Sequence, residues 1–365
     1  MKIDPGLASW LQLSLTPGLG ASTLRKLLRE YGLPELVLAH KRSQLAPFMG
    51  SAAADALDSP RVNDAVRQAL DWAAVEGHFI VTLADESYPR ALLEIADPPA
   101  VLYAHGRLDL LQHPAIAVVG SRNASAQGES NAEQFARALS DAELTIISGL
   151  ALGIDAAAHR GGLAGRSSTV AVLGTGIDVV YPSRNAELAS AIARSGLLVS
   201  EFPLGTDAIA HNFPRRNRLI SGMARGCLVV EAALASGSLI TARSAADQGR
   251  DVFAIPGSIH SPLSKGCHAL IKSGAKLVES AEDVLAELGG FRSSGYATTA
   301  ALSSQTDPGL LGLMGHDPVD VDSLCARAGW SAEQVSSELL RLELDGRVTA
   351  LPGGLYQRLE KAHRG

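Results

Sequence analysis

Four arginines and one phenylalanine gather in residues 211–226, whose sequence is HNFPRRNRLISGMARG. No acidic residue lies between Asp207 and Glu231, although the whole chain has a formal net charge of −6. A groove that combines clustered cations with an aromatic ring is typical of proteins that bind single-stranded nucleic acid. We therefore expect Phe213 to offer a stacking face and the arginines to contact phosphates. These arginines are Arg215, Arg216, Arg218 and Arg225.

A purely structural role is the alternative for this segment. Phe213 would then belong to the core, and the arginines would only solvate the start of a helix. Cations at a helix N-terminus oppose the helix dipole. The binding interpretation is therefore favoured.

Five glycine-containing loops follow short apolar runs between residues 115 and 258. Glycine lets the backbone approach a ligand closely, and the N–H groups at helix starts favour anions. If the runs are parallel strands, all five loops meet at one sheet edge and predict a phosphate-binding crevice. Glycines that serve only tight turns are the alternative. The loops are Gly120–Arg122 with Ser121, Ser148–Asp155 with Gly149, Gly174–Gly176, Ser236–Thr241 with Gly237 and Ser238, and Pro256–Ser258.

Common nucleotide and hydrolase signatures are missing from these loops. A dinucleotide fingerprint needs a third small residue, but Val179 stands at that place after Gly174 and Gly176. The next strand after Gly120 ends in Ser148 rather than in the acidic residue that would bind a ribose. The chain has no G-x-x-x-x-G-K-[ST], G-x-S-x-G or H-E-x-x-H sequence. NAD, ATP held by a P-loop and the commonest hydrolases are therefore disfavoured, and we expect no cofactor.

The composition is that of an α/β protein with an aliphatic core. Of the 365 residues, 46% are hydrophobic and 4% are aromatic. No run of about 18 apolar residues and no signal-peptide pattern occurs, so we expect a cytoplasmic protein without membrane insertion. Cys227, Cys267 and Cys325 lie far apart and outside any metal-ligand spacing. We therefore expect reduced thiols and no metal site.

A predicted doubly wound sheet places the residues that carry this chemistry. Between residues 80 and 278, short β-branched runs alternate with helical stretches. Continuous apolar strands are typical of a parallel sheet that is covered on both faces. We therefore expect an α/β chain with an extended Rossmann-like parallel sheet over residues 76–288. The expected strands are FIVTL, AIAVV, LTIIS, TVAVL, LLVSE, CLVVEA, DVFAI and AKLVES.

A helical domain is predicted before this sheet, over residues 1–75. An amphipathic run there directs Leu24, Leu27 and Leu28 inward. Gly18 and Gly20 precede the run and turn the chain. The pair fits either a phosphate-binding helix-hairpin-helix (SAM-like) unit or a plain docking domain, and both alternatives stay open.

The chain after the sheet is predicted to form a linker, 289–306, and a winged-helix-like domain, 307–365. In that domain Ser331 and Gln334 form a capping box that opens a helix, and a β-ribbon follows. The net negative charge of this helix opposes contact with a DNA major groove. Docking of a protein or a regulatory role is therefore favoured over DNA binding. The charged residues of the helix are Glu333, Glu338, Arg341, Glu343 and Asp345.

An ordered series of motifs resembles the DNA-processing protein A family, also called DprA or Smf. The motifs cover residues 115–280. The resemblance implies a non-catalytic homodimer that binds single-stranded DNA, protects it during natural transformation and loads the RecA recombinase onto it. It also implies a helical N-terminal domain and a C-terminal winged helix. The motifs are GSRNAS, SGLALGID followed by His159, GTGIDVVYPSRN, SEFPLGT, NFPRRNRLISG, VVEAALASGSLITA, GRDVFAIPGS and KGCHALIKSGA.

The resemblance also implies which residues contact DNA. The family's pocket arginine matches Arg122, and its stacking aromatic matches Phe213. A lysine often follows the YP of the third loop, but here Ser183 stands there and Arg184 is placed to reach the same phosphate. The arginine-rich motif matches Arg215, Asn217 and Arg218, and the predicted DNA-binding set is completed by Gly174, Arg216 and Lys265.

The family's dimer surface lies toward the end of the sheet domain. In this chain that position is Cys267–Ala275, and the predicted contacts are Cys267, Leu270 and Ile271.

Two other functions use the same crevice. A related sheet serves nucleotide phosphoribohydrolases, whose P-G-G-x-G-T-x-x-E loop carries a glutamate that does chemistry. The matching loop here, 236–243, has no carboxylate at that spacing, so enzymatic activity is disfavoured. A nucleotide-binding sensor would instead hold one mononucleotide, and its affinity would not depend on DNA length.

Overall fold

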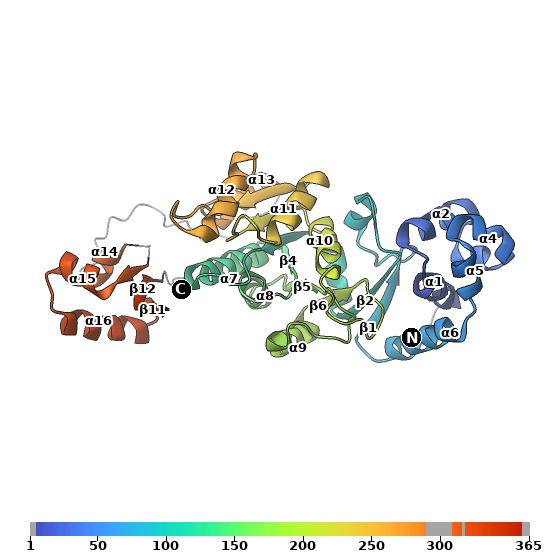
Figure 1. Cartoon of the computed structure of the whole chain (residues 1–365), viewed down its shortest axis with the longest axis horizontal. Helices are drawn as coiled ribbons and strands as arrows, with labels where there is room; N and C mark the ends of the chain where they lie inside the picture. Colours follow the sequence, from blue (N-terminus) through green and yellow to red (C-terminus); the bar gives the residue numbers. More distant parts are fainter. Residues whose placement is uncertain (1–4, 290–308, 316–317, 360–365) are drawn as a thin grey trace.

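The computed structural model describes residues 5–289, 309–315 and 318–359 (Figure 1). Within these residues the chain forms one nine-stranded sheet and a separate three-stranded sheet. None of the helices in these ranges is long and apolar enough to cross a membrane. The predicted linker, 289–306, lies outside the described residues except for its first position.

Parallel strands form the centre and one edge of the large sheet, as predicted. They are β3 (Ala115–Val119), β4 (Thr145–Ser148), β5 (Thr169–Val172), β6 (Leu197–Ser200), β7 (Gly226–Val229), β8 (Asp251–Ala254) and β9 (Lys276–Leu277). Their order is β6-β5-β4-β3-β7-β8-β9. The chain therefore builds one half from β3 to β6 and then returns to add β7 on the other side of β3. Doubly wound sheets hold their ligands at this reversal, outside the carboxyl ends of the strands.

The other edge of the sheet departs from the prediction of parallel strands throughout. It contains β1, His78–Thr82, and an unpredicted strand, β2, Val101–Gly106. β2 pairs antiparallel with both β1 and β6. Val101 and Tyr103 pack into one core with the N-terminal helices, so this strand edge is also covered. A continuous apolar sequence indicates that both faces of a strand are buried. It does not determine whether the strand runs parallel or antiparallel to its neighbours.

Helices cover both faces of the sheet. They are α7 (Ala126–Asp141), α8 (Ile154–Ala164), α9 (Ala186–Ser195), α10 (Asn212–Gly222), α11 (Ser238–Asp247), α12 (Lys265–Lys272) and α13 (Ala281–Leu288). Because side chains alternate along a strand, β3 serves two cores. Ala115 and Ala117 pack with residues of α10 and α11, whereas Ile116 and Val118 pack with residues of α7 and α8. Short 3-10 helices join the elements: η1 (Arg90–Glu94), η2 (Leu108–Gln112), η3 (Ser183–Asn185) and η4 (Pro262–Ser264).

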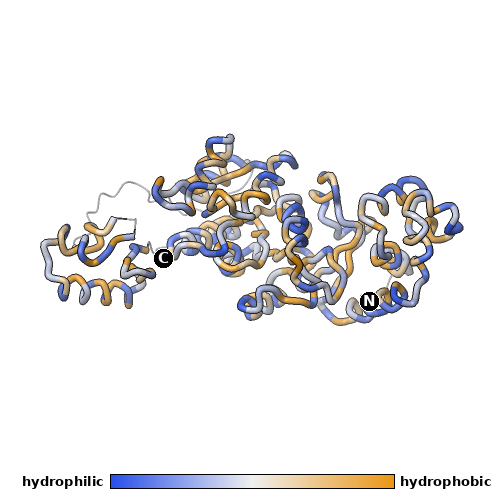
Figure 2. Tube along the Cα trace, in the orientation of Figure 1, coloured by the Kyte–Doolittle hydropathy of each residue, from blue (hydrophilic) through white to orange (hydrophobic). Residues whose placement is uncertain are grey.

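Six short helices precede the sheet within residues 5–73. They are α1 (Pro5–Leu15), α2 (Ala21–Tyr31), α3 (Pro34–Leu38), α4 (Arg42–Met49), α5 (Ser51–Ala56) and α6 (Pro60–Ala73). Leu24 and Leu27 of α2 are buried, as predicted, and Leu28 is partly buried against the same cluster. Figure 2 shows hydrophilic residues on the outer turns. The apolar cluster that holds these leucines continues into Val101 and Tyr103 of β2. The helices and the sheet edge therefore share one core.

The C-terminal part has the predicted winged-helix order. Its elements are α14 (Leu310–Met314), β10 (Val319–Asp320), α15 (Val321–Ala328), α16 (Ala332–Leu344), β11 (Val348–Leu351) and β12 (Leu355–Arg358). The predicted capping box opens α16. The N–H of Gln334 donates to Oγ of Ser331 at 3.3 Å, and the N–H of Ser331 donates to Oε1 of Gln334 at 3.0 Å. A small apolar core of its own stabilises this part.

Candidate nucleic-acid interface

A cleft of about 670 Å³ opens where the strand order reverses. Its walls come from the loop after β3, the loop after β7 and one face of α10. Ala151 and Asp155, which follow β4, also line the cleft. The loop after β5 contributes Tyr181 but not its glycines, and the loop after β8 does not line the cleft.

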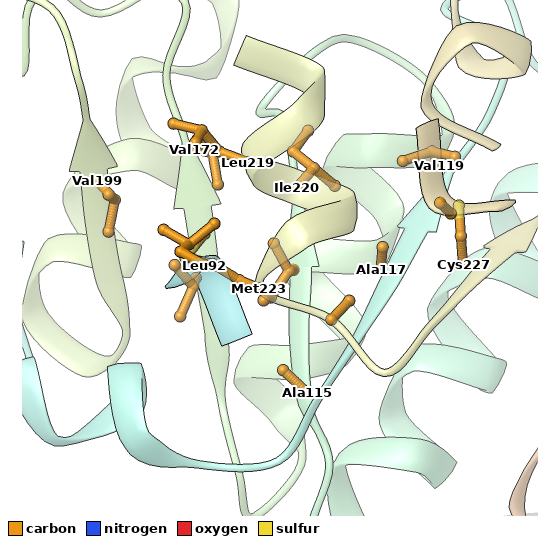
Figure 3. Packing of buried hydrophobic residues seen from close by; sticks show 14 of the residues in the cluster. Leu92, Ala115, Ala117, Val119, Val172, Val199, Leu219, Ile220, Met223 and Cys227 are labelled. Atoms are coloured by element: carbon orange, nitrogen blue, oxygen red, sulfur yellow. The ribbon is translucent and has the colours of Figure 1, made fainter. Parts of the chain in front are cut away.

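α10 is fixed over the sheet by its apolar face. Leu219, Ile220 and Met223 are buried against strand residues (Figure 3). Pro214 lies in the first helical turn, where its fixed φ and missing N–H are tolerated. This anchoring sets which side chains face the cleft. Phe213, Pro214, Arg216, Asn217 and Ile220 line it.

The ring of Phe213 lies among two guanidinium groups and a glycine. The guanidinium carbons of Arg122 and Arg216 are 5.7 Å and 6.0 Å from its centroid, within cation–π range. A Cβ added at Gly174 would stand 2.7 Å from Cδ1 of the ring. Gly174, predicted as a phosphate-binding position, therefore makes room for the aromatic ring.

Arg216 is a buried cation in the wall of the cleft. Only 4% of the residue is exposed. It donates to the carbonyl oxygens of Gly149, at 2.7 Å, and of Val172. Burial lowers the pKa of Arg216 to about 10, while Asp155 opposes the shift. The group is therefore charged at neutral pH but is held inside, whereas the sequence predicted that it projects over the strand ends.

Arg215 and Arg218 lie on the other face of α10. Both pair with Glu201, at 3.4 Å for Arg215, and the side chain of Glu201 is only 2% exposed. Arg218 also lies 3.7 Å from a carboxylate oxygen of Asp97. Neither arginine lines the cleft with Arg122. Helical periodicity separates them from Arg216, which a cluster in linear sequence does not reveal.

Side chains of the protein itself occupy many N–H groups in the glycine loops. In the loop after β4, the N–H groups of Gly149 and Ala151 donate to Oδ2 of Asp155, at 3.1 Å and 3.4 Å. The N–H of Leu150 donates to Nε2 of His159 at 3.2 Å. Burial lowers the pKa of His159 to about 3, so this imidazole is neutral. Arg122 and Arg216, rather than these amides, give the cleft its positive charge.

Several predicted site residues lie outside the cleft wall. Ser148 is buried, and its hydroxyl donates to the carbonyl of Val118 at 2.7 Å. Arg184, on η3, and Lys265, at the start of α12, are exposed but do not line the cleft. The predicted residues that do line it, besides those of α10, are Gly120, Ser121, Arg122, Gly237, Ser238 and Thr241.

Tyr181 is a further aromatic in the cleft that sequence reasoning did not single out. Its side chain is exposed, and its ring centroid lies 5.6 Å from that of Phe213 at a tilt of 44°. The available signal was its place in the loop that follows Gly174 and Gly176. Two aromatic rings thus lie side by side beside Arg122.

The predicted dimer contact Cys267 needs correction. Its side chain is fully buried, and its thiol lies 3.7 Å from the carbonyl oxygens of Val229 and Val230. It belongs to the core under α12 and has no surface for a partner chain. Leu270 and Ile271 are half-buried on the same helix, and their part in a dimer stays a prediction.

Family models and sequence relatives agree on one group of proteins. The model of DNA recombination-mediator protein A matches residues 79–289, and that of the DprA winged helix domain matches residues 296–354. The chain is 43% identical to Protein Smf of Escherichia coli over 81% of its own length and 82% of that protein. It is 51% identical to DNA processing protein DprA of Streptococcus pneumoniae over 56% of its own length and 73% of that protein.

Solved structures give the same result. The X-ray structure of DNA processing protein A from Streptococcus pneumoniae matches with a TM-score of 0.68 at 40% identity, over 80% of this chain and 100% of that one. A structure of the Helicobacter pylori protein, described for its single-stranded DNA binding mode, matches with a TM-score of 0.53 at 29% identity. That match covers 57% of this chain and 95% of the other.

Proposed function

Because this chain belongs to the DNA recombination-mediator protein A family, whose members process DNA, we propose that its cleft binds single-stranded DNA. The observation that carries the proposal is the ring of Phe213 held beside the guanidinium groups of Arg122 and Arg216. Aromatic rings stack on bases of any sequence, and cations attract the backbone. The single-stranded DNA binding described for the Helicobacter pylori relative supports the same ligand here.

The two arginines take different parts in the proposed binding. Arg122 is exposed on the loop after β3 and is free to form direct phosphate contacts. Arg216 is buried, so its charge acts on the cleft through a medium of low dielectric constant. Phe213 and Tyr181 offer neighbouring faces for successive bases. The cleft thus combines one exposed cation, one buried cation and two aromatic rings.

We infer that the cleft binds DNA without cutting it. Among the described residues that line the cleft, Asp155 is the one acidic side chain. Its Oδ2 already accepts two backbone N–H groups, and burial raises the pKa of its carboxyl. This carboxylate therefore organises the loop and is poorly placed to activate water.

Membership in the family supports a wider role for the DNA-bound protein. We propose that it works in the cytoplasm as a homodimer that protects incoming single strands during natural transformation and loads RecA onto them. Leu270 and Ile271 of α12 are the proposed dimer contacts, since both are apolar and partly accessible.

Titration of labelled oligo-dT at several salt concentrations tests the cleft. Arg122→Ala should weaken binding and reduce the slope of log affinity against log salt by about 0.7 to 1, because one phosphate contact is lost. Arg166→Ala is the matched control. Arg166 is exposed and lies just before β5, at the amino ends of the strands, whereas the cleft lies at their carboxyl ends. Its removal should therefore leave the slope unchanged.

Two outcomes would contradict the proposal. A folded Arg122→Ala protein with wild-type affinity and slope would show that DNA binds elsewhere. Tight binding of a single mononucleotide, with no gain for longer oligo-dT, would favour a small-nucleotide sensor in the same cleft.

A further inference from the structure

The side chain of Glu231, which follows β7, is bound to the start of α7. Its Oε2 accepts the N–H of Ser125 at 2.9 Å, and its Oε1 accepts the hydroxyl of Ser125 at 2.6 Å. Ser125 is the N-cap of α7, and its Oγ in turn accepts the N–H of Gly128 at 2.9 Å. The N–H and the hydroxyl of Ser125 thus both donate to one carboxylate, and the N–H of Gly128 is linked to it through the Ser125 hydroxyl.

The helix is shaped to receive this carboxylate. A Cβ added at Gly128 would clash with the carboxyl group of Glu231, so the missing side chain is what makes room for it. The backbone of Glu231 is fixed as well, because its carbonyl accepts the N–H of Ser121 at 2.7 Å. Glu231 is therefore held by both its main chain and its side chain.

The place that Glu231 fills is the usual phosphate position of this kind of sheet. α7 follows β3, the strand at which the strand order reverses. In Rossmann-like sheets the N-terminus of that helix points at the phosphate of a bound nucleotide. Here the cleft is lined by Gly120 to Asn123 of the preceding loop but by neither Ser125 nor Glu231. The N-cap of α7 is thus bound to an internal carboxylate and does not line the cleft.

We propose that Glu231 determines ligand specificity: its carboxylate occupies the anion position of α7 and excludes nucleoside diphosphates, triphosphates and dinucleotides from the cleft. This inference rests on the proposed function, in which the cleft takes single-stranded DNA. A free nucleotide depends on one strong phosphate anchor, and here that anchor is already neutralised by a negative charge. A polymer gains affinity from contacts repeated along its backbone and needs no phosphate at this helix.

Calorimetric titration of the full chain with inorganic pyrophosphate and with ADP, both without metal ions, tests the proposal. The wild-type protein should show no saturable binding. Glu231→Ala should show saturable pyrophosphate binding, at least tenfold tighter than any residual binding by wild type, because the N–H and hydroxyl of Ser125 lose their internal acceptor. Glu231→Gln should show a smaller gain, since it removes the charge but keeps the volume. Glu231→Asp keeps the charge and should resemble wild type.

A double variant assigns the new binding to α7. Gly128→Val places a side chain where the carboxylate was, so Glu231→Ala combined with Gly128→Val should lose the gain. A gain that persists in the double variant would place the anion elsewhere and overturn the proposal.

Oligo-dT titrations of the same proteins separate the two proposals. Glu231→Ala should keep oligo-dT affinity within about twofold of wild type, because Glu231 does not line the cleft. If wild type fails to bind oligo-dT, the proposed function fails, whatever the pyrophosphate series gives. If folded Glu231→Ala and Glu231→Gln proteins bind pyrophosphate no better than wild type, Glu231 is not the specificity residue. Should Glu231→Ala not fold, the contrast between Glu231→Gln and Glu231→Asp decides alone.

Discussion

α10 and α16 are helices of similar length that use their charged residues in opposite ways. α10 carries three arginines and no acid, yet Arg216 is buried and Arg218 is paired with Glu201. α16 carries more acids than bases, and its Arg341 pairs with Glu338 of the helix and with Asp345 at the C-cap. α16 also offers apolar side chains to solvent: Leu344 is 81% exposed and Leu340 is 58% exposed.

The difference shows that packing decides which charges are usable. α10 lies over a sheet, so each arginine is assigned to the cleft, to the interior or to Glu201 by its helical face. α16 has one face in a small core and the other in solvent, where its one arginine is paired with Glu338 and Asp345. α10 is therefore suited to a nucleic acid, and the exposed leucines of α16 suit a protein partner.

The largest effect should come from Arg216→Ala. The carbonyls of Gly149 and Val172 would lose a buried charged donor, so we expect the free energy of unfolding to fall by about 3 kcal/mol. Arg215→Ala changes the neighbouring, half-exposed residue and should cost less than about 1 kcal/mol. Urea unfolding of both proteins checks this. Equal losses of unfolding free energy in the two variants would mean that the burial of Arg216 does not make it more important for stability than Arg215.

Phe213→Ala should weaken oligo-dT binding by about 1–3 kcal/mol and leave the salt slope nearly unchanged, because stacking releases no counterions. Anisotropy at four or five salt concentrations measures both quantities. A fall in slope as large as that of Arg122→Ala would indicate that the whole cleft had collapsed.

Removal of the winged helix should have a much smaller effect on the affinity for DNA. A chain that ends at Ser304 should bind oligo-dT within about twofold of the full chain, because residues 317–365 carry eight acidic and six basic side chains and weakly repel phosphate. Both proteins are compared at one salt concentration, with dimerisation checked in parallel. Tenfold weaker binding by the short protein would show that the domain contacts DNA.

Leu344→Ser should change least of all. Its side chain lies in solvent, so thermal unfolding and oligo-dT affinity should match those of wild type. Leu342→Ser is the matched control, since Leu342 is buried two positions earlier and its replacement should lower the unfolding temperature of the winged helix. Equal losses in both variants would show that Leu344 is already packed against something.

Much of the fold could be predicted because local signals were strong. The eight expected strands were found, and the Ser331 and Gln334 capping box opens α16 as expected. β2 was missed because VLYAHG follows two prolines and has no helical partner to mark a β-α unit. A strand at an antiparallel edge is recognised by its tertiary pairing more than by its own sequence.

The candidate site was harder to predict because it depends on long-range partners. Arg218 pairs with Glu201 on the preceding loop and with Asp97, which is far away in the sequence. Asp155 accepts the N–H of Gly149, which the sequence assigned to a ligand, and Glu231 accepts the N–H of Ser125 at the N-cap of α7. The family resemblance placed Cys267 at a dimer surface, but a motif match does not report burial, and its side chain is buried. The loops were identified correctly, but their hydrogen-bond partners required the fold.

The core shared by the N-terminal helices and β2 affects how deletion mutants can be interpreted. A chain begun at residue 76 would present Val101 and Tyr103 to water, and such an apolar face promotes aggregation. A loss-of-function phenotype from that deletion would then report insolubility rather than a missing partner of the helices. Point substitutions at exposed positions of α2, such as Lys26 and Arg29, would test the outer surface of the helices without exposing the core that they share with β2.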